Sequence, residues 1–104
     1  MKEREMVTGL VRGKGEAYVF LAEEDIGTQF MREAGREGFV FGDGVSAADR
    51  KAGDIMCIGE NRRICYVGYA GHMAYSFGRK NGKPIARIDY AEYRTAVRTK
   101  RTHE

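Results

Sequence analysis

The sequence predicts a single α+β domain in which one main helix packs on a mostly antiparallel β-sheet. Apolar residues repeat at helical spacing in one segment, residues 23–36, and at the two-residue spacing of strands in several others. Turn-forming sequences rich in glycine and asparagine separate these segments. A length of 104 residues suits one domain, which we assign to residues 1–93. Residues 94–104 form a basic tail, either a frayed helix or a disordered arm.

The first half of the chain predicts an N-terminal hairpin followed by the helix. Two apolar stretches, residues 6–11 and 17–21, flank a Gly-Lys-Gly turn and are expected to pair as strands. The helix over 23–36 starts with three acidic residues, which the helix dipole favours, and Gly38 suits its C-terminal cap. Its predicted core face consists of Ile26, Phe30, Met31 and Ala34.

The second half predicts a C-terminal β-meander. Its four expected strands cover residues 55–58, 63–67, 72–77 and 85–90, and Asn81-Gly82 supplies the last turn. In the simplest register of the first pair, Cys57 and Cys65 lie opposite each other.

Composition excludes several classes of protein. Eighteen basic and fifteen acidic residues give a net charge of +3, which is compatible with nucleic acid without requiring it. The N-terminal residues are charged and no apolar run approaches the roughly 18 residues of a membrane span, so we expect a cytoplasmic protein without membrane contact. Two cysteines are too few for a disulfide-stabilised secreted scaffold.

One segment suggests binding of single-stranded nucleic acid. Residues 14–21, Lys-Gly-Glu-Ala-Tyr-Val-Phe-Leu, resemble the aromatic strand of cold-shock domains and RNA-recognition motifs. That resemblance implies base stacking on Tyr18, with Arg12 and Lys14 at the phosphates. Glu16 stands where those families carry an aromatic residue, which favours an ordinary structural strand.

Zinc binding is a further alternative. Cys57, Cys65 and His72 could converge on zinc, with Asp54 or His103 as a fourth ligand. Their spacing differs from the usual zinc patterns, so buried free thiols are the expected state and no metal or other cofactor is expected. The sequence shows no acid–base pair typical of catalysis, and we expect no enzymatic activity.

The segment from Gly38 to Phe77 contains the stretches GFVFGDG, DIMCI and ICYVGYAGHMAYSF. In size and style it resembles small phage and mobile-element proteins of Gram-positive bacteria, including anti-CRISPR and other anti-defence proteins. The resemblance implies a non-enzymatic inhibitor, a monomer or a homodimer, that occupies a surface of a host defence protein such as a CRISPR nuclease. Aromatic residues suit such an interface, and the candidates for partner binding are Tyr66, Tyr69, Tyr75, Tyr90 and Tyr93.

Overall fold

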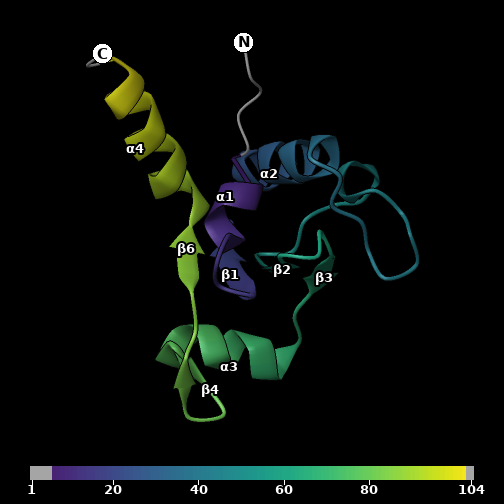
Figure 1. Ribbon diagram of the computed structural model, residues 1–104, viewed down its shortest axis with the longest axis vertical. Helices are drawn as coiled ribbons and strands as arrows, with labels where there is room; N and C mark the ends of the chain where they lie inside the picture. The colour runs from purple at the N-terminus through teal and green to yellow at the C-terminus, as the bar shows by residue number, and fades with distance from the viewer. Residues whose placement is uncertain (1–5, 103–104) are drawn as a thin grey trace.

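The computed structural model describes the backbone of residues 6–102 and side chains as far as residue 97 (Figure 1). The elements follow in the order α1 (Thr8–Val11), β1 (Glu16–Phe20), α2 (Glu24–Arg36), the 3₁₀ turn η1 (Ala47–Asp49), β2 (Ile55–Gly59), β3 (Ile64–Tyr66), α3 (Tyr69–Phe77), β4 (Arg79–Lys80), β5 (Lys83–Pro84), β6 (Arg87–Asp89) and α4 (Tyr90–Thr102). This is the predicted α+β class. No helix within the described residues is both long enough and apolar enough to cross a bilayer.

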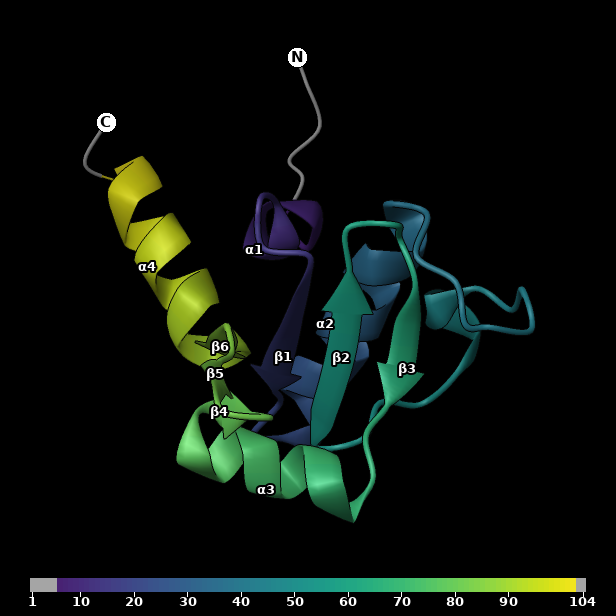
Figure 2. The same cartoon turned by 60° about the horizontal axis from the view of Figure 1, so that its bottom comes forward.

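The main sheet has the strand order β3-β2-β1-β6. The β2–β3 hairpin is confirmed, including the opposition of Cys57 and Cys65. β1 runs antiparallel to β2 on one side and parallel to β6 on the other. Figure 2 shows α2 behind these strands and α3 across their lower ends.

The helix predicted over 23–36 is confirmed as α2. Its buried face contains Phe30, Met31 and Ala34, which pack into a core with Val19 of β1 and Met56 of β2. An apolar face at this spacing is what places one side of a helix against a sheet.

The predicted N-terminal hairpin is wrong, because residues 8–11 form the helix α1 instead of a strand. Val7, Leu10 and Val11 are buried, and their spacing suits one face of a helical turn as well as a strand. The Glu37 carboxylate, at the end of α2, accepts hydrogen bonds from the backbone N–H groups of Val7 and Thr8 and from the Thr8 hydroxyl. This distant cap satisfies the amides that a short helix leaves unpaired.

The predicted four-stranded meander is also wrong beyond its first hairpin. Residues 69–77 form the helix α3, which ends at Gly78 in a left-handed conformation with φ 72°. The last predicted strand is only partly present, since β6 covers residues 87–89 and joins β1 in parallel. The Asn81-Gly82 turn is present, but it connects the small separate hairpin of β4 and β5.

Helix α4 is attached to α2 through polar and aromatic contacts. The Tyr90 hydroxyl donates a hydrogen bond to Glu33, and the Arg94 guanidinium lies 2.8 Å from the other carboxylate oxygen of Glu33. The ring of Tyr90 meets that of Phe30 edge to face, with centroids 4.9 Å apart. Burial, and then the Glu33 hydrogen bond, raise the pKa of Tyr90, so its hydroxyl remains a donor.

Candidate functional site

Helix α3 begins with an ionic and hydrogen-bonded anchor. His72 Nδ1 lies 2.9 Å from the Gly68 carbonyl oxygen. His72 Nε2 lies 3.0 Å from Oδ1 of Asp54, the residue that precedes β2. Both ring nitrogens therefore face acceptors, which favours the doubly protonated imidazolium. The Gly68 carbonyl and then the Asp54 carboxylate raise the pKa of His72, and the hydrogen bond from His72 lowers the pKa of Asp54.

The inner side of α3 rests on the sheet. Ala74 is buried, and the ring of Tyr75 packs on Phe20 of β1 with centroids 5.9 Å apart. Arg87 of β6 donates to the Tyr75 carbonyl at 2.9 Å, and its guanidinium lies 5.8 Å from the centre of the Tyr75 ring. Burial raises the pKa of Tyr75. These contacts fix the direction in which the outer side faces.

The outer side of α3 is an exposed row of large side chains. Tyr69, Met73 and Phe77 are four residues apart and are 81%, 37% and 68% exposed. Residues four apart lie one above another on a helix, so we call these three the apolar ridge. A contiguous apolar surface of this kind on a small protein is typical of a contact site.

Basic side chains border the C-terminal end of the apolar ridge. The β4–β5 hairpin begins two residues after Phe77 (Figure 1). Its exposed cations are Arg79, Lys80 and Lys83. Lys80 points back toward the sheet, where its amino group is 3.7 Å from Glu16 and 5.9 Å from the centre of the Tyr18 ring. Lys83 pairs with Lys80 and shares its face of the hairpin, whereas Arg79 is on the other face, two residues after Phe77.

The five tyrosines predicted for partner binding lie in different environments. Tyr69 belongs to the ridge, and Tyr66 is half exposed with its hydroxyl bonded to the Lys51 carbonyl at 2.7 Å. Tyr75 is partly buried, Tyr90 is completely buried, and Tyr93 stacks on Tyr90. Tyr90 is therefore a core residue rather than an interface residue.

Sequence reasoning missed Phe77 as a surface residue. The sequence predicts a strand over residues 72–77, in which Met73, Tyr75 and Phe77 would share one face. The four-residue spacing of Tyr69, Met73 and Phe77 was the available signal.

The predicted nucleic-acid site does not form as a stacking surface. Tyr18 is only 3% exposed, so its ring offers no open face to a base. Arg12 and Lys14 are exposed, but they lie in the turn before β1, away from any exposed ring of that strand. The residue carrying the resemblance to cold-shock and RNA-recognition strands is thus part of the interior.

The predicted zinc ligands are only partly brought together. Cys57 and Cys65 are paired across β2 and β3, whereas His72 is bound to Asp54. Within the part of the chain that the structure describes, no three His, Cys, Asp or Glu side chains are arranged to hold a metal ion. His103 lies outside that part. Cys65 is exposed, contrary to the expected burial, because it points away from α2 on an edge strand.

Comparison with known proteins gives no match to a family model, to a curated protein or to a solved structure.

Proposed function

We propose that this protein is a non-enzymatic inhibitor that binds a host nucleic-acid-targeting defence protein through the apolar ridge of α3. The exposure of Tyr69, Met73 and Phe77 on one side of a well-anchored helix carries the proposal. Helices that bind in a groove use anchors at such spacing. The resemblance of residues 38–77 to anti-CRISPR-like proteins supports the choice of target class.

The ridge offers enough apolar area to matter for affinity. A Phe side chain buries on the order of 150–250 Å² when fully covered. Phe77 is 68% exposed, so covering it removes on the order of 100 Å² from water. At about 25 cal/mol/Å² this contributes about 2.5 kcal/mol, or roughly 60-fold in affinity. The helix is already folded and anchored, which reduces the entropy lost on binding.

Charge around the ridge defines the kind of surface that it fits. Arg79 is exposed two residues after Phe77, so we expect the matching surface to be an apolar recess with acidic side chains at that end. A basic channel that binds nucleic acid would be repelled there. The proposed contact is therefore a protein surface outside such a channel, which suits inhibition by blocking a moving part or a subunit contact.

The nucleic-acid alternative predicts a different dependence on the same residues. Phosphate binding would rely on cations such as Lys14, Arg79 and Lys83 and would weaken steeply with salt. Binding through the apolar ridge would depend on Phe77, and its affinity would change little at moderate salt concentration. The two functions can thus be separated by substitution and by ionic strength.

The test is inhibition of cleavage by a panel of purified CRISPR nucleases acting on labelled target DNA. We expect at least one nuclease to be inhibited, and Phe77→Ser to raise the half-inhibitory concentration by roughly 60-fold. Lys14→Ser is the matched control at an exposed position in the turn between α1 and β1, at the end of β1 opposite α3 (Figure 2), and it should leave inhibition unchanged. Circular dichroism would verify that both variants are folded.

Three results would argue against the proposal. Failure to inhibit any nuclease would refute the proposed target class. Unchanged inhibition by Phe77→Ser would refute the role of the apolar ridge in binding. Inhibition that disappears with excess unrelated DNA, and that Lys14→Ser also weakens, would identify a nucleic-acid binder instead.

A further inference from the structure

Cys57 and Cys65 face each other across two neighbouring antiparallel strands. The Gly59 N–H donates to the Arg63 carbonyl at 3.0 Å, which makes Gly59 and Arg63 a hydrogen-bonded pair. Cys57 and Cys65 lie two residues further along each strand, so they form the next pair of the same type. Their Cα atoms are then about 5.5 Å apart, within the range of about 4.4–6.8 Å that disulfides span. Cβ atoms in such a pair are about 5.5 Å apart, so the strands must close by about 1 Å to form the bond, and the resulting strain makes it easily reduced.

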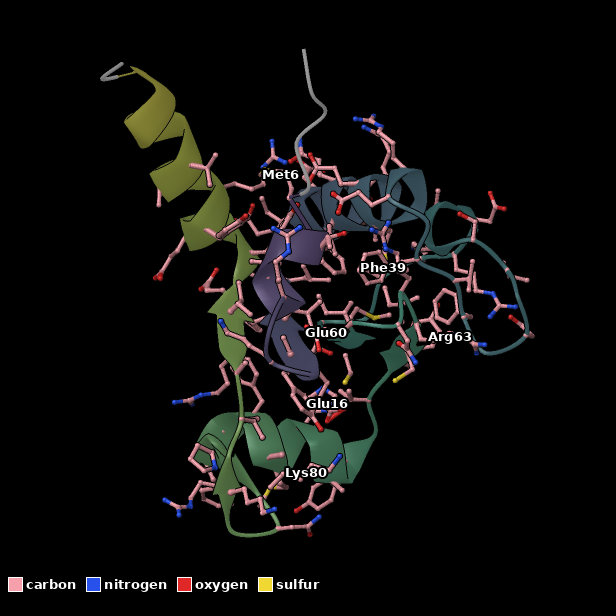
Figure 3. All side chains as sticks on the ribbon, in the orientation of Figure 1. Met6, Glu16, Phe39, Glu60, Arg63 and Lys80 are labelled. Carbon is pink, nitrogen blue, oxygen red and sulfur yellow. The ribbon has the colours of Figure 1, made fainter. Side chains whose placement is uncertain are left out.

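Both thiols are on the sheet face opposite α2. Their strand neighbours Met56, Ile58 and Ile64 are buried, and side chains alternate between the two faces of a strand. The thiols border an open hollow of about 520 Å³, whose lining includes Glu16, Glu60 and Arg63, labelled in Figure 3. A small reagent can therefore reach the exposed Cys65 directly.

We propose that Cys65 and Cys57 form a reversible cross-strand disulfide by exchange with a low-molecular-weight disulfide of the glutathione type. The Cys65 thiolate attacks one sulfur of the reagent, forms a mixed disulfide and releases one thiol. Cys57 then loses its proton and attacks the Cys65 sulfur, which forms the Cys57–Cys65 bond and releases the second thiol. The two protein thiols are oxidised while one reagent disulfide is reduced to two thiols.

The surroundings assign different roles to the two cysteines. Burial, and then the charge of Glu16, raise the pKa of Cys57 to about 12, so this thiol is a poor first nucleophile. Its thiol donates to Glu16 Oε1 at 3.7 Å, and the proton that Cys57 loses on attack passes to the departing glutathione thiolate. Cys65 is exposed and reacts first, and Cys57 is the resolving thiol. This inference does not depend on the ridge of α3.

The test is incubation of the purified full-length protein with oxidised glutathione, followed by intact mass analysis and alkylation of free thiols. We expect a monomer that has lost two hydrogen atoms and no longer reacts with the alkylating reagent. Cys57→Ser should instead hold a stable glutathione adduct on Cys65, and Cys65→Ser should react at least tenfold more slowly. Reduced glutathione in excess should restore both thiols.

A matched control moves one thiol along the same face. Cys65→Ser combined with Arg63→Cys places it diagonally from Cys57, where separations are about 7–8 Å, beyond the span of a disulfide. Internal disulfide formation should be at least tenfold slower than in the wild type. An equal rate in this control, a stable glutathione adduct on the wild-type protein, disulfide-linked dimers as the main product, or no reaction would each overturn the proposal.

Discussion

Replacing Gly35 with alanine should destabilise the protein although it improves the intrinsic helix propensity of α2. A Cβ atom at position 35 would lie 2.6 Å from the Ala48 Cβ, 2.7 Å from the Ala48 backbone nitrogen and 2.9 Å from the Ser46 hydroxyl oxygen. Two of these neighbours belong to the 3₁₀ turn η1, and one is backbone, which has no alternative rotamer. The turn must therefore shift away from the helix.

The size of the effect follows from two opposing terms. Added volume in a packed contact costs about 1–3 kcal/mol, and the backbone clash places Gly35→Ala at the upper end of that range. Alanine in place of glycine inside a helix contributes about 1 kcal/mol in the other direction. We expect a net loss of about 1–2 kcal/mol, which lowers Tm by about 5–15 °C in a domain of this size.

Gly27→Ala, in the same helix, is the matched control. Its Cβ atom would lie 3.1 Å from the Ala52 Cβ, a methyl group on the loop before β2 that can move by a few tenths of an ångström. The propensity gain should then roughly cancel the packing cost, leaving stability within about 0.5 kcal/mol of wild type. Urea denaturation of the three proteins measures the difference. If Gly35→Ala is as stable as wild type or more stable, the close packing of α2 and η1 is refuted.

Two further substitutions test the attachments of α3 and α4. The raised pKa of His72 adds stability that is lost as pH rises through it, and the lowered pKa of Asp54 adds stability that is lost as pH falls through it. Asp54→Asn should therefore destabilise the protein most between pH 3.8 and pH 6.5, the ordinary pKa values of an aspartate and a histidine. Urea denaturation at pH 5.5 and 8.5 should show a smaller loss of stability at the higher pH. Glu33→Ala leaves the buried Tyr90 hydroxyl without its acceptor and should cost about 2–3 kcal/mol, with faster amide exchange throughout α4. The exposed pair of Glu24 with Lys51 supplies its control, since Glu24→Ala should cost less than about 0.5 kcal/mol; equal losses would contradict the role of Glu33.

The predictable parts of the fold are those that local sequence determines. In α2 the apolar spacing extends over thirteen residues, and in the β2–β3 hairpin the strands flank a short polar turn. In α1 and α3 the segments are short, and strand-forming residues such as Val11 and Tyr75 fit either structure. Contacts with remote residues decide in favour of helix: the Glu37 carboxylate caps α1, and Asp54 and Arg87 hold α3.

The candidate site was predictable in composition but not in geometry. Tyr69 is a candidate because tyrosine is common at interfaces, yet this property is shared by the buried Tyr90. Phe77 becomes a surface residue only once its segment is a helix. The pairing of Cys57 with Cys65 was predictable, since a hairpin turn fixes the register of its strands.

The position of β1 in the sheet has a consequence for synthesis on the ribosome. This strand is synthesised before both of its neighbours, since β2 follows about forty residues later and β6 about seventy residues later. Until β2 and then β6 have been made, the corresponding edges of an apolar strand containing Ala17 and Val19 are open to other extended chains. We expect shielding of this strand by a chaperone, or rapid synthesis of residues 55–89, to reduce its pairing with a neighbouring polypeptide.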